Sequence, residues 1–138
     1  METRSVLWIY AIAAVAFPAA WISLLRVIGD GWEFRTVTAA FGILEAATTL
    51  FALGGAVWFT ATARGRNTTG VLVTVWIAAA CLVVGWGSMA VAHWEEYQAD
   101  MALPIINLFM FLIPIGTVLV FAAAIAETAS RARSKRQR

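Results

Sequence analysis

The stretch TVTAAFGILEAATTLFALGGAVWFTATA, residues 36–63, decides the fold, because its 28 residues carry a single charge, Glu45. An α-helix needs about 20 mainly apolar residues to cross the hydrocarbon core of a bilayer. A segment of this length and composition is therefore typical of a transmembrane helix.

Three more stretches of this kind occupy residues 5–25, 67–92 and 101–126, and none of them contains a charge. Of the 18 charges in the chain, 17 thus lie in the short segments outside the four apolar stretches. Charged residues make up 13% of the chain, against about 25% in a soluble domain. The sequence predicts an all-α integral membrane protein, an up-and-down bundle of four transmembrane helices over residues 1–128, followed by a basic cytoplasmic tail at residues 129–138.

The placement of lysine and arginine predicts the orientation in the cell membrane. In an up-and-down bundle, both termini and the central connection share one side, which would collect eight of the ten basic residues: Arg4, Arg64, Arg66, Arg131, Arg133, Lys135, Arg136 and Arg138. The opposite side would hold Arg26 and Arg35 together with the acids Asp30, Glu33, Glu95, Glu96 and Asp100. The positive-inside rule then places both termini in the cytoplasm.

Charge and cysteine content argue against several classes of function. Five of the ten basic residues lie in the last eight positions, so the basic character describes a tail and not a surface for nucleic acid. The single cysteine, Cys81, allows no internal disulfide and no cysteine metal cluster. We therefore expect no metal, no cofactor and no nucleic-acid partner.

Glu45 is the strongest candidate functional residue. It lies ten residues after Arg35, about 15 Å into its helix at 1.5 Å per residue. A carboxyl group at that depth should either be protonated or find a hydrogen-bond donor. The residues three and four positions away include Gly42, Thr48 and Thr49, a small and hydroxylated face that helices present to one another in lipid. A structural role, with a neutral Glu45 bonded to Thr48, Asn107 or a backbone carbonyl, is the alternative.

A second candidate group ends the third apolar stretch. If that helix continues, His93, Glu96 and Tyr97 share one face. His93 and Glu96 could relay a proton or bind a metal ion, but one helical turn offers only two ligands, which argues against a metal site. Asn107 would lie two turns into the fourth helix, so that Glu45, His93 and Asn107 line one outward cavity. Pro18 and Pro114 would kink the first and fourth helices, which favours such a cavity. Ligand binding is assigned to Glu45, Thr49, Trp86 and Asn107, and catalysis, for an enzyme, to Glu45, His93 and Glu96.

Residues 42–55 (GILEAATTLFALGG), His93 and Asn107 resemble the DoxX-like group of small four-helix membrane proteins. In that group a glutamate in the second helix heads an apolar run that ends in glycine, and a histidine often follows the third helix. The resemblance implies a membrane accessory or redox-associated role and no defined reaction.

Two classes of function stay open. The first is an accessory or transport-type protein that binds a lipophilic ligand or a membrane-protein partner through Glu45, with a homo-oligomer left open; a transporter of this kind would exchange a proton for a lipophilic cation. The second is a membrane-embedded enzyme, such as an acid-catalysed cyclase or isomerase of an isoprenoid-type substrate, with Glu45 as the acid. Whether the protein is an enzyme is undecided from the sequence.

Overall fold

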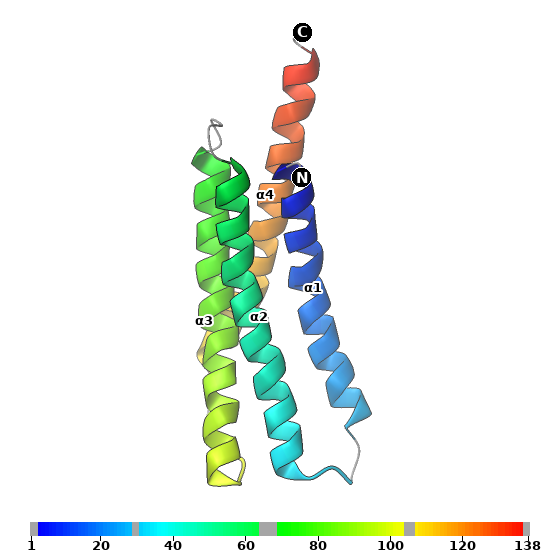
Figure 1. Ribbon diagram of the computed structural model, residues 1–138, viewed down its shortest axis with the longest axis vertical. Helices are drawn as coiled ribbons and strands as arrows, with labels where there is room; N and C mark the ends of the chain where they lie inside the picture. The colour runs from blue at the N-terminus through cyan, green and yellow to red at the C-terminus, as the bar shows by residue number, and fades with distance from the viewer. Residues whose placement is uncertain (1–2, 29–30, 64–68, 104–106, 137–138) are drawn as a thin grey trace.

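The structure is a computed structural model that describes residues 3–28, 31–63, 69–103 and 107–136 (Figure 1). Its elements, in chain order, are α1 (Thr3–Val27), α2 (Phe34–Ala63), α3 (Thr69–Ala99), a short 3₁₀ helix η1 (Leu108–Phe111) and α4 (Leu112–Arg136). Four segments, α1, α2, α3 and Leu108–Arg133, are long and apolar enough to cross a membrane. The predictions of an all-α chain and of four membrane-length helices are confirmed.

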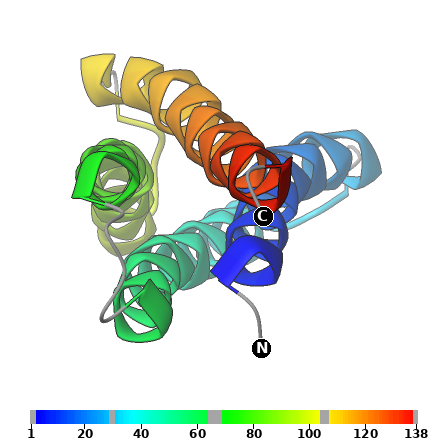
Figure 2. The same ribbon diagram turned by 90° about the horizontal axis from the view of Figure 1, so that it is seen from above.

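The four helices form a closed ring of neighbours. Each packs against the next along the chain, and α4 returns to α1 (Figure 2). Within the described ranges, the diagonal pairs α1 with α3 and α2 with α4 make no comparable contact. The inner faces of all four helices therefore share one core.

The inner face of α2 is the small and hydroxylated face that the sequence predicts. Its buried residues recur every three or four positions from Thr38 to Ala63, whereas Ile43 and Leu50 on the opposite face are each 71% exposed. Glycines bring α3 close to this face. A Cβ at Gly87 would lie 3.6 Å from Thr49 Cγ2, as expected of helices that approach through small residues.

Helix α1 is buried only in its first half. All of its buried residues precede Pro18: Thr3, Val6, Leu7, Tyr10, Ala11 and Ala14. The first half is fixed by Tyr10, whose hydroxyl donates to the Ala52 carbonyl at 2.7 Å. After Pro18 the helix diverges from α2 (Figure 1), and none of its described residues is fully buried.

The fourth apolar stretch differs from its prediction. Helix α3 continues past residue 92 to Ala99, and Asp100, with φ of 53°, ends it in the left-handed conformation. Met101–Leu103 are not helical, and Pro104 lies outside the described residues. Asn107 caps η1 by accepting a hydrogen bond from the Phe109 N–H. Asparagine favours this capping position, so Asn107 precedes the helix instead of lying two turns within it.

Pro114 does not interrupt the fourth helix. It is the third residue of α4. Proline is tolerated in the first turn of an α-helix, because a backbone N–H there has no acceptor within the helix. Pro18, by contrast, lies inside α1 as predicted.

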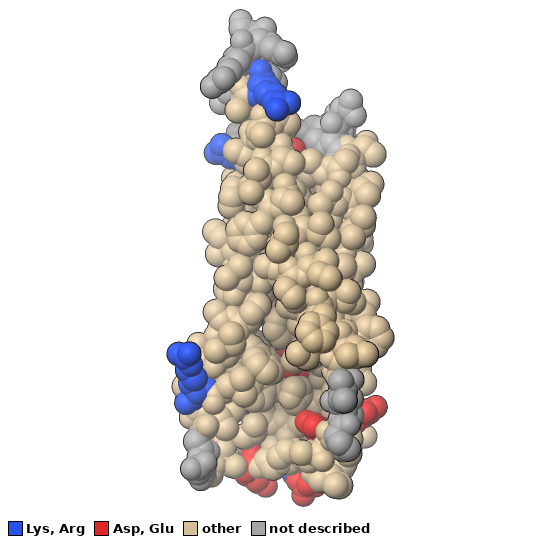
Figure 3. Space-filling view, turned by 180° about the vertical axis from the view of Figure 1, so that it is seen from behind, with Lys and Arg blue, Asp and Glu red and all other residues tan. Residues whose placement is uncertain are grey.

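At its other end, α4 continues as a helix to Arg136, into the segment that the sequence analysis assigns to a separate tail. Glu127 Oε1 accepts a hydrogen bond from Arg131 Nε at 2.9 Å one turn later. Figure 3 shows acidic residues gathered at the opposite end of the molecule. Charged residues thus lie mainly toward the two ends of the molecule, and the middle of its surface is apolar.

Candidate functional site

Glu45 is fully buried, with 0% of its surface exposed. Its Oε1 accepts a hydrogen bond from Trp21 Nε1 of α1 at 2.8 Å, and its Oε2 lies 2.8 Å from His93 Nδ1 of α3. Each carboxyl oxygen therefore has a partner from a different helix. The expectation that Glu45 finds a donor is confirmed, but the partners are not those proposed from the sequence. The Thr48 hydroxyl donates to the Leu44 carbonyl instead, and Asn107 bonds elsewhere.

The contacts of His93 define where its proton lies. Nδ1 is 2.8 Å from Glu45 Oε2 and 3.2 Å from the Met89 carbonyl oxygen. A carbonyl oxygen can only accept, so both contacts are hydrogen bonds only when Nδ1 carries the hydrogen. Glu45 is then an acceptor on both oxygens, which is the behaviour of a carboxylate.

The imidazole is held by aromatic packing as well as by Glu45. It stacks on Phe41, with ring centroids 5.5 Å apart and an angle of 23° between the planes. Trp21 also packs on Phe41, with the two ring centroids 5.2 Å apart. A Cβ at Gly42 would lie 3.6 Å from His93 Cβ, so the absence of a side chain there lets α3 come close. We call Trp21, Phe41, Glu45 and His93 the carboxylate–imidazole cluster.

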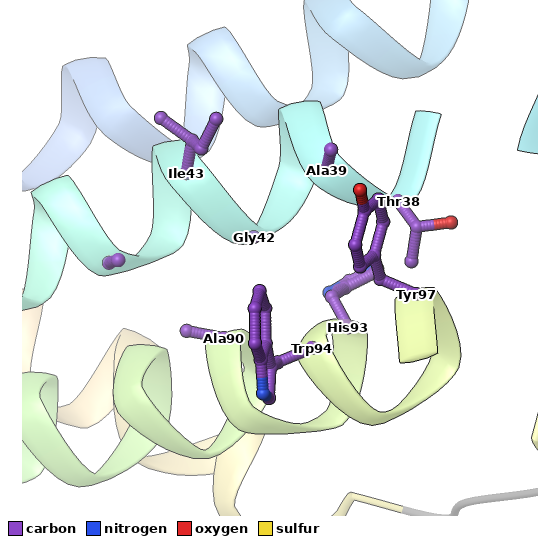
Figure 4. Close-up of a pocket in the computed structure, with 9 residues that line it drawn as sticks. Thr38, Ala39, Gly42, Ile43, Ala90, His93, Trp94 and Tyr97 are labelled. Atoms are coloured by element: carbon purple, nitrogen blue, oxygen red, sulfur yellow. The ribbon is translucent and has the colours of Figure 1, made fainter. Parts of the chain in front are cut away.

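A groove lies beside this cluster, between α2 and α3, with a volume of about 500 Å³. Figure 4 shows the rings of Trp94 and Tyr97 beside it. It opens on the outer surface of the bundle, where Ile43 is 71% and Trp94 59% exposed. We call it the α2–α3 groove; its lining is Thr38, Ala39, Gly42, Ile43, Ala46, Ala90, His93, Trp94 and Tyr97.

His93 connects the groove to the buried acid. Its side chain is 21% exposed and lines the groove, while Glu45 lies behind it and is not part of the lining. Within the described part of the chain, Nε2 of His93 has no hydrogen-bond partner. A molecule in the groove would thus meet the imidazole, and Glu45 would act on it through that ring.

Glu96 follows one turn after His93, since α3 continues through both residues. Its Oε1 accepts a hydrogen bond from the Leu103 N–H at 3.2 Å, which holds the connection after α3. Of the three predicted catalytic residues, the structure therefore brings Glu45 and His93 together and engages Glu96 elsewhere.

Thr49 and Asn107 line a different hollow, of about 800 Å³, between α3, α2 and η1. There Asn107 Nδ2 donates to Ser88 Oγ at 3.0 Å. Trp86 lines neither hollow, because it is 3% exposed and belongs to the hydrophobic core. The prediction of one cavity shared by Glu45, His93 and Asn107 is thus corrected, because His93 and Asn107 line different hollows and Glu45 lines neither.

Sequence reasoning missed Trp21 and Trp94 as parts of the site. No pattern in the sequence pairs Trp21 with Glu45, because the contact depends on how α1 diverges after Pro18. Tyr97 lines the groove together with His93, with which the sequence places it on one helix face. Its ring also receives the Arg35 guanidinium, whose Cζ lies 4.6 Å from the ring centroid.

Among the described residues, no group of three histidine, cysteine or acidic side chains is placed to hold a metal ion. The chain matches no model of a known protein family, no curated protein and no solved structure. The function proposed below accordingly rests on the geometry of the carboxylate–imidazole cluster and the α2–α3 groove.

Proposed function

We propose that this protein is a small integral membrane protein that binds a lipophilic ligand from the bilayer in the α2–α3 groove. The observation that carries the proposal is the partly exposed imidazole of His93 in an otherwise mainly apolar groove, held from behind by a buried carboxylate. A ligand site of this kind combines an apolar wall with a few fixed polar groups. The groove volume of about 500 Å³ also falls within the usual range of roughly 300–1,000 Å³ for small-molecule sites.

Glu45 and His93 have distinct roles in this proposal. His93 contacts the ligand through Nε2, and Glu45 fixes the orientation of the ring and the hydrogen on Nδ1. An ionisable residue inside a membrane span is expensive unless it has a partner. The position of this pair beside an open groove favours a binding role over a purely structural one.

We further propose that the four helices cross the cell membrane in up-and-down order, with both termini cytoplasmic. The positive-inside rule supports this orientation, since Arg4 and Arg131 belong to the terminal ends and Glu33, Glu95 and Glu96 to the other. The α2–α3 groove would then open sideways into the outer leaflet. In a Cys81→Ser background, Arg66→Cys and Glu95→Cys should react with a membrane-impermeant maleimide from opposite sides of the cell, and labelling from one side would disprove the topology.

The class of function stays that of a DoxX-like accessory or transport-type protein, and this resemblance remains a prediction. An enzyme is the second candidate, because the imidazole of His93 lines a groove while its Nδ1 is held by a carboxylate. Such an arrangement suits an imidazole that gives and takes protons. Glu45 itself is enclosed, so in an enzyme it would orient His93 and not protonate the substrate directly.

Photo-crosslinking tests the binding proposal. The full chain in dodecyl maltoside is irradiated with hexadecanol that carries a diazirine and an alkyne, and labelled peptides are identified by mass spectrometry. We expect saturable labelling of the peptides that contain Ile43 and Trp94. Gly42→Leu should reduce it at least threefold by filling the groove.

Gly54→Leu is the matched control, because it adds the same side chain to α2 at a position where a Cβ meets nothing within 4 Å. Labelling that is non-saturable, or equal in the two leucine variants, would refute a specific site in the groove.

A further inference from the structure

We propose that the ligand of the α2–α3 groove is a lipophilic cation, and that its binding releases the proton held on Nε2 of His93. The inference rests on the proposed function, since it assigns the ligand class of the same groove. It changes the exchanging group from Glu45, as the sequence suggests, to the imidazole that reaches the groove.

The charge of the carboxylate–imidazole cluster carries the inference. Glu45 is a carboxylate that accepts from Trp21 and His93, and Trp21 is neutral. Among the described residues, His93 is the one basic side chain in ionic contact with Glu45. The cluster is therefore neutral when His93 is protonated and carries a charge of −1 when it is not. A buried negative charge in an apolar span needs a counter-charge.

The walls of the groove suit an organic cation. Trp94 and Tyr97 line it and stack on each other, with centroids 5.8 Å apart. The faces of tryptophan and tyrosine attract cations, and more strongly where water is excluded. Tyr97 already receives the Arg35 guanidinium on its ring, which shows that this aromatic surface accommodates a positive group.

The other charged groups near His93 are one acid and one base. From α3, Glu96 follows one turn later and is acidic. From α2, Arg35 places one positive charge over Tyr97, while α1 contributes the uncharged Trp21. Helix α4 has Glu127, Arg131 and Arg133 at the opposite end of the molecule. Glu96 and Arg35 are of opposite charge, so the charge of the carboxylate–imidazole cluster decides the preference of the groove for a cation.

The exchange balances charge and protons. In the empty site, Nε2–H and Nδ1–H make His93 positive and the cluster neutral. When the cation enters, the Nε2 proton leaves to the water at the acidic end of the bundle, where α3 ends six residues after His93. His93 becomes neutral, and the cation compensates Glu45. One positive charge replaces another, so the membrane span never holds an uncompensated charge. Nδ1 keeps its hydrogen throughout because Glu45 and Met89 both accept it.

Binding of tetraphenylphosphonium tests the inference, with tetraphenylborate as an anion of matched size and shape. The full chain in dodecyl maltoside is titrated calorimetrically between pH 5 and pH 9, in two buffers with different heats of ionisation. We expect saturable binding of the cation, with release of about one proton at low pH. Affinity should fall about tenfold for each pH unit below the titration of His93, as one linked proton requires. The anion should not bind saturably.

Two variants separate the roles of the pair. Glu45→Gln removes the negative charge and should weaken cation binding at least tenfold at pH 8. His93→Asn keeps a donor near the position of Nδ1 but removes Nε2, so it should change the pH dependence of cation binding, and the double variant Glu45→Gln/His93→Asn should abolish it. Equal binding of cation and anion, or a pH dependence in His93→Asn identical to that of the native chain, would overturn the inference.

The two probes distinguish failure of the proposed binding site from failure of the proposed ligand class. If hexadecanol labels the groove in a Gly42-dependent manner while the cation shows no preference, the groove is a binding site and only the ligand class is wrong. If neither probe depends on Gly42, both proposals fall.

Discussion

Trp21 Nε1 lies 2.8 Å from Glu45 Oε1, and this hydrogen bond connects the exposed second half of α1 to the core of the bundle. After Pro18, none of the described residues of α1 is fully buried. The second half of α1 is therefore held in place by this bond and by the packing of Trp21 on Phe41.

Replacement of Trp21 by phenylalanine keeps an aromatic ring against Phe41 but removes the indole N–H. A hydrogen bond to a charged group contributes about 1.5–3 kcal/mol, so we expect Trp21→Phe to lower the free energy of unfolding by about 2 kcal/mol. The measurement is unfolding in mixed dodecyl maltoside and sodium dodecyl sulfate micelles, followed by circular dichroism. Trp32→Phe is the control, because Trp32 is 49% exposed, and it should change stability by less than about 0.5 kcal/mol. Equal effects would show that the bond to Glu45 adds no stability.

His93 contacts Glu45 through Nδ1 and also lines the α2–α3 groove, and two substitutions separate the contact from the loss of the imidazole. An asparagine amide can still donate to Glu45 Oε2, so His93→Asn should lose no more than about 1 kcal/mol of stability. His93→Ala leaves Glu45 short of one donor and removes the stack on Phe41, and should lose about 3 kcal/mol. Both variants remove the imidazole from the lining of the groove. Unfolding in mixed micelles distinguishes them, and equal stability of the two would contradict the role assigned to Nδ1.

Glu45 should be the most sensitive position of the cluster. Glu45→Ala removes the acceptor for both Trp21 and His93 and opens a space in the core, so we expect a loss of about 3–5 kcal/mol. Glu45→Gln keeps the shape and one acceptor oxygen, and should lose about 1–2 kcal/mol because its amide N–H₂ group opposes the Nδ1–H of His93. Thermal unfolding in dodecyl maltoside measures these losses, and Glu45→Ala should be less stable than Glu45→Gln. A Glu45→Ala variant as stable as the native protein would refute the carboxylate–imidazole cluster as a structural centre.

The sequence predicts the fold better than it predicts the site, for physical reasons. Apolar runs of membrane length and the spacing of small residues around Glu45 are local features, so the four helices and the inner face of α2 follow directly from them. The contact between Glu45 and His93 joins two helices in register, and the sequence placed these residues only at neighbouring depths. The start of the fourth helix could not be predicted, because the run from Met101 to Ala126 is uncharged throughout and hides the cap at Asn107.

The predicted ligand residues Thr49 and Trp86 do not line the α2–α3 groove, and helical spacing could not show this. Thr49 follows Glu45 by one turn and shares its helix, yet it lines the hollow on the other side of the α2 and α3 contact. Trp86 belongs to the core because its face of α3 is turned inward. Helical spacing alone identifies neighbours along one helix, but it does not show which side of a neighbouring helix they face.

The contact between α3 and α4 depends on Gly116, and alanine there should separate the two helices. A Cβ at Gly116 would lie 2.7 Å from Leu82 Cγ and 2.9 Å from the Ala78 carbonyl oxygen. The leucine could change rotamer, but the backbone oxygen can move only with α3. Overpacking of this kind costs about 1–3 kcal/mol. Gly116→Ala should lower the free energy of unfolding in mixed micelles by that amount.

Gly54 supplies the matched control for this last prediction. It lies in the middle of α2, and a Cβ there would meet nothing within 4 Å. Because glycine is a weaker helix former than alanine by about 0.5–1 kcal/mol, Gly54→Ala should leave stability unchanged or raise it slightly. A loss in Gly116→Ala together with no loss in Gly54→Ala attributes the effect to the contact between α3 and α4. If both variants are equally stable, the two helices are not held at the distance that Gly116 permits.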